Sequence, residues 1–219
     1  MNQNNNLDTS IERLVSLLDL EDIEKNIFRG ESQDIGSPQV FGGQVLGQAL
    51  MAASRTVVDR NVHSLHAYFL RRGDFEAPIV YEVDRARDGG SFSNRRVIAV
   101  QHGEQIFNMT SSFQVPEDGL EHQSAMPNVP PPEELEDLVD LIKPEWIEQL
   151  PLRIRRMLTR ERPFEVKPVE TPHFLINEVK DPIKHSWIRA KGSMSNDIVM
   201  HQALLAYVSD YDLLTTAIL

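Results

Sequence analysis

The chain has 219 residues, of which 41% are hydrophobic and none is cysteine, and its formal net charge is −11. This length suffices for one large or two small globular domains. The lack of cysteine excludes disulfides, thiolate metal sites and a cysteine nucleophile. It also fits a reducing, cytoplasmic compartment. The charge argues against general nucleic-acid binding, because Lys and Arg supply most of that affinity, and the absence of a long apolar run or a signal-peptide pattern predicts a soluble protein.

The first quarter of the chain predicts a short helix, a brief strand and a long helix. Apolar residues recur at helical spacing over residues 10–20, after Ser10 as a plausible N-cap. Residues 27–31 indicate a strand, and residues 40–57 indicate the long helix. The glycines and alanines of this long helix lower its intrinsic propensity but leave room for another backbone to approach closely. We therefore expect it to be a central helix wrapped by other elements.

Four strands are predicted next, over residues 63–70, 79–87, 92–101 and 104–115, each bounded by Gly-containing or polar turns. Their short connections predict an antiparallel meander. One buried helix followed by four strands indicates an α+β arrangement in which a curved sheet wraps the helix. Residues 10–116 are expected to form this first unit.

The composition then shifts to Pro, Glu and Asp, so residues 117–162 are interpreted as a linker with a helix, which is irregular over residues 146–160 and interrupted at Pro151. Residues 164–169 and 186–190 predict strands, and residues 201–219 predict an apolar helix. Residues 48–52 and 202–206 match at four of five positions, as a duplicated unit would require. Residues 163–219 are therefore expected to begin a second unit of the same kind.

Asp210 is the first functional candidate, because it falls in the interior of the predicted apolar helix. Asp is a poor residue for a helix interior, and a carboxylate on a buried face is costly unless it is paired. The predicted helix also ends in apolar residues at Leu219, without a Gly or a basic last turn. This ending predicts partners that the printed sequence does not contain.

Several motifs together resemble the acyl-CoA thioesterase II family. They are Phe28-Arg29-Gly30, residues 39–50, residues 63–70 with Gly73-Asp74, residues 88–93 with Arg95-Arg96-Val97, and His201-Gln202 with Ser209-Asp210. The resemblance runs from about Leu14 to Leu219. It implies a double hotdog fold, in which two sheets each wrap a central helix, and hydrolysis of acyl-CoA thioesters to a fatty acid and coenzyme A.

The resemblance also implies that Asp210 is the catalytic acid, acting with a hydroxyl and a Gln amide to position and polarise the attacking water. Both partners are expected beyond Leu219, so we expect the second hotdog to be incomplete and this chain to hydrolyse acyl-CoA poorly. Two other functions stay open. The chain could be a non-catalytic acyl-CoA binding or assembly subunit, or a hotdog hydratase. Unpaired strand edges and an uncovered helix face predict a homo-oligomer.

The remaining candidates each have a structural alternative. Gly42, Gly43 and Gln44 could bind substrate at the start of the long helix, although close packing explains the glycines almost as well and Gln44 could simply bridge structure. His63 could carry a proton, but a structural histidine is the more common case. His66 follows it by three positions on a strand, so a shared metal site is not expected. No cofactor is expected, and an anionic ligand would need one of the basic clusters at residues 85–87, 95–96 or 153–162.

Overall fold

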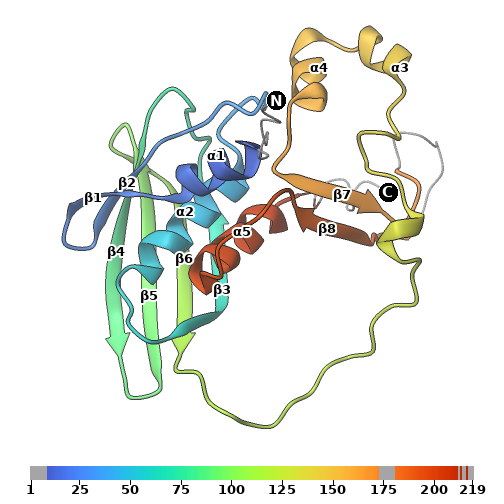
Figure 1. Ribbon diagram of the computed structural model, residues 1–219. Helices are drawn as coiled ribbons and strands as arrows, with labels where there is room; N and C mark the ends of the chain where they lie inside the picture. The colour runs from blue at the N-terminus through green and yellow to red at the C-terminus, as the bar shows by residue number, and fades with distance from the viewer. Residues whose placement is uncertain (1–8, 173–180, 212, 214–215, 217–219) are drawn as a thin grey trace, which may run out of the picture. The chain divides into compact units, whose positions relative to one another are not determined.

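The computed structural model describes residues 9–172, 181–211, 213 and 216 (Figure 1). These residues divide into two compact units. The first, which we call the sheet unit, contains Leu14–Gly119 and Ser195–Tyr211. The second, which we call the linker unit, contains the other described residues. The division of the chain into two hotdogs at residues 116 and 163 stays a prediction.

The described part of the sheet unit contains one six-stranded sheet, in which every neighbouring pair is antiparallel. The four strands predicted from the sequence are confirmed to within two residues at each end, and a short strand at Glu21–Glu24 was not predicted. The strands are β1 (Glu21–Glu24), β2 (Ile27–Gly30), β3 (Asn61–Phe69), β4 (Ile79–Asp88), β5 (Phe92–Gln101) and β6 (Glu104–Gln114).

The predicted four-strand meander is wrong for β3. The strand order is β1-β2-β4-β5-β6-β3. Of the four predicted strands, only β4, β5 and β6 follow one another in the sheet, and β3 lies at the far edge beside β6. Strands β3 and β4 are three places apart, a distance of about 14 Å at the usual strand spacing. The segment 70–78 can span about 30 Å when extended, so a short connection does not force its two strands to pair. Strand β2 occupies the place beside β4 instead.

The central helix α2 (Gly42–Ser54) is buried from Gly43 to Ala53, which confirms the predicted wrapped helix. It is shorter than the predicted span 40–57, because Phe41 has an extended backbone and Arg55 ends the helix. Figure 1 shows α2 lying against one face of the sheet, with helix α5 (Ile198–Ser209) alongside it. The side chain of Asp197 accepts a hydrogen bond from the Val199 backbone N–H and so caps the start of α5.

Two glycines of α2 allow its backbone to lie directly against α5. A Cβ atom at Gly43 would overlap the carbonyl oxygen of Tyr207, and a Cβ at Gly47 would lie 3.1 Å from the carbonyl oxygen of Ala203. Gly43 thus lies beside Tyr207 and Gly47 beside Ala203, so the residue numbers rise along α2 as they fall along α5 and the two helices run antiparallel. The small residues that the sequence placed on α2 therefore serve helix-to-helix packing.

Buried polar side chains fasten α2 to its surroundings. The Gln48 amide is fully buried, donates to the Leu17 and Glu31 carbonyl oxygens at 2.7 and 2.9 Å, and accepts from the Tyr81 hydroxyl at 2.7 Å. A Cβ at Gly30 would lie 2.7 Å from the Gln48 side chain. Gly30 is therefore required by close packing on this amide.

The other end of α2 is held by a buried arginine. The Arg95 side chain has no exposed surface, and it donates to the Thr56 hydroxyl at 2.6 Å and to the Asp88 carboxylate at 2.6 Å. Hydrogen bonds from Arg95 and Ser93 hold the pKa of Asp88 well below its usual range. Arg95 is thus committed to the fold and cannot serve as the solvent-facing anion site considered from the sequence.

The linker unit contains the start of α1 (Thr9–Leu18), a short helix η1 (Pro132–Glu134), the helices α3 (Pro144–Gln149) and α4 (Leu152–Thr159), and the antiparallel pair β7 (Phe164–Pro168) and β8 (Ser186–Ala190). The predicted interruption at Pro151 is confirmed. Ser10 lies inside α1, and its hydroxyl donates to the Arg162 carbonyl oxygen at 3.1 Å. The prediction that Ser10 is the N-cap is wrong, because α1 begins at Thr9 and Ser10 is already a helical residue.

We predict that Tyr81→Phe destabilises the protein. Removing the hydroxyl leaves the buried Gln48 oxygen without its donor, which costs about 1–3 kcal/mol and lowers the midpoint of thermal unfolding by several degrees. Tyr68→Phe is the matched control, because Tyr68 is 60% exposed on β3. Circular dichroism melts of both variants measure the effect, and equal midpoints would contradict a stabilising role for this hydrogen bond.

Candidate active site

Asp210 lies at the C-cap of α5, directly after the last helical residue Ser209, with φ −84° and ψ 2°. The prediction that it sits inside a helix running from His201 to Leu219 is therefore wrong. Asp competes for backbone hydrogen bonds and favours helix ends over helix interiors, so the helix breaks where the acid stands. Most of the predicted continuation lies outside the described residues; Leu213 and Thr216, which are described, are helical.

The carboxylate of Asp210 lies on the N-terminus of α2. A Cβ at Gly42 would be 2.6 Å from Asp210 Oδ2, and the Gly43 backbone N–H donates a hydrogen bond to the carboxylate. No described side chain of the chain segment that enters α2 caps this helix, because Phe41 stands at the N-cap. Asp210 supplies the acceptor that the first helical amides need.

Two effects oppose each other at this carboxylate. Partial burial raises the pKa of Asp210 above its ordinary value of 3.8, and the hydrogen bond from Gly43 lowers it by a smaller amount, so the net shift is upward. The partial positive charge at a helix N-terminus also favours the ionised form. The site thus holds an acid whose ionisation is costly enough to make it a better proton acceptor than a free aspartate.

Asp210 and Gly42 border a cavity of about 300 Å³, which we call the acid cavity. Its wall includes Phe69, whose ring lies 5.1 Å from that of Phe107. Arg71 also lines it, at the end of β3. Arg71 is not among the basic clusters considered from the sequence, although it forms a pair with Arg72 just as Arg95 does with Arg96.

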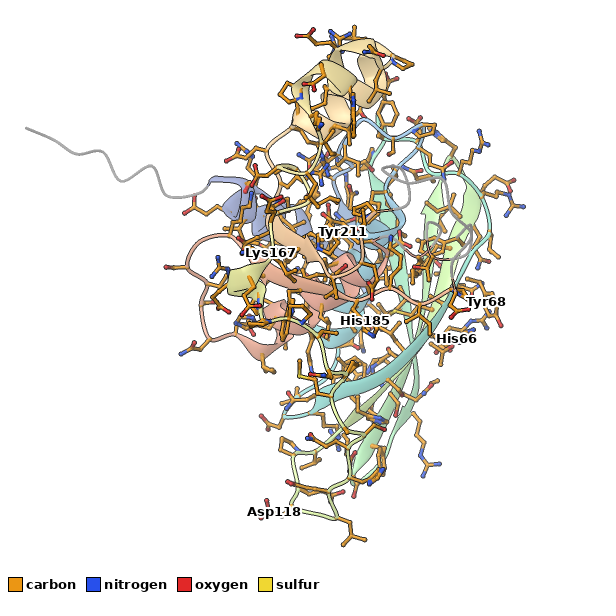
Figure 2. All side chains as sticks on the ribbon, turned by 90° about the vertical axis from the view of Figure 1, so that its right-hand side faces the viewer. His66, Tyr68, Asp118, Lys167, His185 and Tyr211 are labelled. Carbon is orange, nitrogen blue, oxygen red and sulfur yellow. The ribbon has the colours of Figure 1, made fainter. Side chains whose placement is uncertain are left out.

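Aromatic side chains brace the junction between α5 and α2. The Phe41 ring makes edge contacts with Tyr207 and Tyr211, at centroid distances of 5.1 and 5.5 Å, and Figure 2 labels Tyr211. Phe41 directly precedes Gly42 in the sequence, and Tyr207 and Tyr211 lie before and after Asp210. They limit how far the carboxylate can move from the helix N-terminus.

His63 lies in a different cavity. This second cavity, of about 310 Å³, lies between α2, β3 and α5 and is lined on its apolar side by Leu46, Leu50, Val62, Leu65, Leu205 and Ala206. The His63 Nε2 atom is 2.9 Å from the Ser112 hydroxyl, and Asp210 does not line this cavity. The structure therefore brings Asp210 together with Gly42 and Gly43, but it does not place His63 in the same cavity.

Gln44 is occupied by structural hydrogen bonds. Its side chain is 1% exposed, its oxygen accepts from the Gln33 backbone N–H at 3.1 Å, and its nitrogen donates to the Glu31 carbonyl oxygen at 3.1 Å. These bonds tie the segment after β2 to the first turn of α2. They support the bridging interpretation of Gln44 over substrate binding by its side chain.

His66 has no metal-binding arrangement around it. Its ring lies 4.8 Å from that of Tyr68, and Figure 2 shows the two side by side on β3. Across the described residues, no group of three or more His, Cys, Asp or Glu side chains could hold a metal ion. Of the two histidines, His63 lines the second cavity.

Comparisons with known proteins match both segments that meet at Asp210. A family model described as the acyl-CoA thioesterase N-terminal domain matches residues 29–114, and one described as acyl-CoA thioesterase matches residues 155–219. Acyl-CoA thioesterase 2 from Haemophilus influenzae is 45% identical over 212 residues, covering 95% of this chain and 73% of the relative. The chain belongs to the acyl-CoA thioesterase family.

Solved structures agree with this membership. The chain resembles an acyl-CoA thioesterase II from Mycobacterium marinum with a TM-score of 0.71 and 40% identity, covering 94% of this chain and 69% of that one. It also resembles a hot dog fold protein from Alicyclobacillus acidocaldarius, with a TM-score of 0.69 and 22% identity over 90% of this chain and 68% of that one, which shows the fold alone. The expected α+β hotdog architecture of this thioesterase family member is confirmed.

Within the described ranges, none of the helices has the length and apolar character needed to cross a membrane.

We predict that Asp210→Asn stabilises this thioesterase-family protein at neutral pH. The folded pKa of Asp210 is raised, so the folded state binds its proton more tightly than the unfolded state. The wild type therefore loses stability relative to the neutral asparagine variant as pH rises from below 3.8 through the folded pKa. Asn still accepts from the Gly43 N–H, since Asn is a good capping residue.

Urea unfolding of both proteins between pH 3.5 and 7.5 measures this difference. Asp197→Asn is the control, because Asp197 caps the opposite end of the same helix. A stability gap between wild type and Asp210→Asn that does not grow with pH would contradict the raised pKa.

Proposed function

We propose that this protein hydrolyses acyl-CoA thioesters to a carboxylic acid and free coenzyme A, with Asp210 as the group that activates the water. The observation that carries the proposal is the meeting of the Asp210 carboxylate with the N-terminus of α2 beside a cavity. A proton acceptor and a cluster of backbone donors at one point are what attack of water on a thioester requires. The family comparisons support the same reaction.

In the proposed mechanism, the Asp210 carboxylate accepts a proton from a water molecule as its oxygen attacks the thioester carbonyl carbon. The carbonyl oxygen gains negative charge and takes hydrogen bonds from the first amides of α2, at Gly42 and Gly43. Collapse of the tetrahedral intermediate breaks the carbon–sulfur bond, and the proton held on Asp210 passes to the departing sulfur, which releases free coenzyme A and restores the carboxylate. The Gly43 N–H already donates a hydrogen bond to the Asp210 carboxylate in the free protein. When substrate binds, this N–H donates to the thioester carbonyl oxygen instead.

The two glycines contribute by having no side chain. A Cβ at Gly42 would collide with Asp210 Oδ2 and approach Phe69 to 3.0 Å. Only glycine lets both the carboxylate and a thioester reach the helix N-terminus. The substrate-binding role of Gly42 and Gly43 thus rests on backbone amides and open space, whereas Gln44 acts by holding the first turn of α2 in place.

The relatives named as thioesterases favour hydrolysis over hydration. A non-catalytic acyl-CoA binding subunit would share the cavity and the helix N-terminus but would not depend on the charge of Asp210. We also propose a cytoplasmic location, from the absence of cysteine, and a homo-oligomer, in which copies associate through the exposed β3 edge with Tyr68 and Phe69.

We predict that Asp210→Asn lowers the kcat/KM of this chain for acyl-CoA, which the sequence already leads us to expect to be low, by at least about 100-fold, because loss of a general base typically costs a factor of 100 to 10,000. Release of free thiol from decanoyl-CoA measures the rate. Asp197→Asn serves as the matched control on the same helix and should keep the activity of the wild type. Undiminished turnover by Asp210→Asn would overturn the mechanism and direct attention to His63.

We also predict that Gly42→Ala lowers kcat by about 10- to 100-fold while the protein stays folded. The new methyl group displaces the carboxylate from its place beside the helix N-terminus, and a displacement of about 1 Å can cost that much rate. Gly90→Ala is the control, since a Cβ there meets nothing within 4 Å. Equal kcat values for Gly42→Ala and the wild type would show that Asp210 does not act from its observed position.

A further inference from the structure

Arg71 and Asp210 are the charged side chains among the described residues that line the acid cavity. They do not pair with each other, because the Arg71 guanidinium forms its ion pair with Glu104. The pKa of Asp210 is set by burial and by the Gly43 N–H, with no contribution from an arginine. The cavity therefore carries a positive charge that the proposed activation of water does not use.

Two contacts hold the Arg71 guanidinium at the turn between β5 and β6. One of its nitrogens donates a hydrogen bond to the Gln105 carbonyl oxygen at 2.7 Å, and the other lies 3.2 Å from the Glu104 carboxylate. The turn itself is tight, with φ of 51° at His102 and 77° at Gly103. The guanidinium thus has a defined place, although 53% of the Arg71 side chain is exposed and open to a ligand.

This place is distant from the point where the thioester is expected to react. A Cβ at Gly42 would be 3.0 Å from the ring of Phe69, and Phe69 pairs with Phe107 on β6. Gln105 and Glu104 precede Phe107 by two and three residues, which corresponds to about 7 and 10 Å along a strand. A thioester carbonyl at the first amides of α2 is therefore roughly 10 Å from the guanidinium and does not contact it.

The separation suits a phosphate of coenzyme A. About 13 bonds join the sulfur of an acyl-CoA to its first phosphorus, and with bonds of about 1.5 Å in a zigzag chain they span up to roughly 16 Å. A bent arm therefore brings a phosphate to the guanidinium while the thioester lies at Gly42. A guanidinium matches phosphate oxygens with paired, charge-assisted hydrogen bonds, and a chain of net charge −11 needs such a local cation to bind an anionic substrate.

We propose that Arg71 binds a phosphate group of the coenzyme A portion, and that Glu104 occupies the guanidinium until this phosphate displaces it. The inference rests on the proposed function, which supplies the ligand. The Glu104 side chain is 64% exposed, so its ion pair with Arg71 contributes little to folding and is readily given up. A phosphate group replaces it with more acceptor oxygens. Glu104 thus competes with the substrate and lowers the affinity for coenzyme A.

The test is a substitution that should improve binding. Glu104→Gln should tighten the binding of coenzyme A about two- to fivefold, which is what breaking an exposed ion pair releases. Arg71→Gln should weaken binding at least about tenfold, because a hydrogen-bonded charge pair is lost. The double variant should bind as weakly as Arg71→Gln alone, since Glu104 acts only through Arg71. Isothermal titration calorimetry of coenzyme A with the whole 219-residue chain measures the dissociation constants.

Glu21→Gln is the matched control. The Glu21 carboxylate lies 3.0 Å from the Arg29 guanidinium in a similarly exposed ion pair on β1 and β2, and neither residue lines the acid cavity. The substitution changes the net charge by the same amount as Glu104→Gln. It should leave the dissociation constant of coenzyme A within twofold of the wild type.

Three ligands identify the phosphate that is bound. Coenzyme A carries a pyrophosphate and a 3′-phosphate, dephospho-coenzyme A carries the pyrophosphate alone, and pantetheine carries neither. A gain in Glu104→Gln that persists with dephospho-coenzyme A assigns the pyrophosphate, and a gain that vanishes assigns the 3′-phosphate. Pantetheine should bind alike to Glu104→Gln and the wild type. An equal gain with pantetheine would show that no phosphate is involved and would overturn the proposal.

The remaining outcomes separate this proposal from the proposed function. Tighter binding of coenzyme A by Glu104→Gln, without a gain in Glu21→Gln or in the double variant, supports the phosphate site. Binding that is equal in Glu104→Gln and the wild type, or absent from both, overturns it. Hydrolysis is followed separately, as thiol release from decanoyl-CoA. If hydrolysis is absent and the gain is present, the proposed function fails while the phosphate site stands.

Discussion

The close approach of the α2 and α5 backbones is the constraint on which the rest of the molecule depends. A Cβ atom at Gly43 would overlap the Tyr207 carbonyl oxygen, and a Cβ at Gly47 would crowd that of Ala203. This contact fixes the register of two helices that lie far apart in the sequence. It brings the C-cap of one to the N-terminus of the other, and so it places Asp210 at Gly42. A larger side chain at Gly47, which lies outside the site, would press on the Ala203 carbonyl oxygen and so move the acid away from the amides.

The Asp210 carboxylate makes one stabilising and one destabilising contribution to the fold. Asp210 completes the first turn of α2, which has no described side-chain cap of its own, yet its partial burial makes its charge costly. A neutral asparagine would satisfy the same amide at a lower electrostatic cost. An acid thus stands where we predict that an amide is more stable, which fits the role proposed for Asp210, because function and stability are often opposed at catalytic positions.

Much of the sheet unit could be predicted from the sequence, because turn residues and alternating patterns mark strands locally. The span of β5 was predicted to the residue, and the small residues of α2 correctly indicated a wrapped helix. The position of β3 could not be predicted, since pairing with β6 depends on the path of segment 70–78 across the sheet. Local pattern also gave the wrong place to Asp210, which stands at the C-cap of α5 and meets Gly43, a residue far away in the sequence.

The candidate site was predictable only in pieces. Asp210, Gly42 and Gly43 were each identified from residue type and family resemblance, but nothing in the sequence indicated that they touch. Burial explains two other differences: Arg95 looked like one of a pair of surface cations, yet it is enclosed by Thr56 and Asp88, and Gln44 looked available to a ligand, yet backbone groups use both of its polar atoms. Such hydrogen bonds join separate segments of the chain, so they can be recognised only in the folded structure.

The use of Asp210 as a cap for α2 has a consequence for the order in which the protein folds. The cap and the helix that it completes are separated by more than 160 residues, as Gly43 and Asp210 show. Contacts of such long range form late, because the chain must close a large loop before they contribute any free energy. The sheet can wrap α2 while the remainder of the chain is still being synthesised, but the helix N-terminus stays hydrated until α5 docks. The contact of Asp210 with the N-terminus of α2 therefore forms only after these two distant segments have docked.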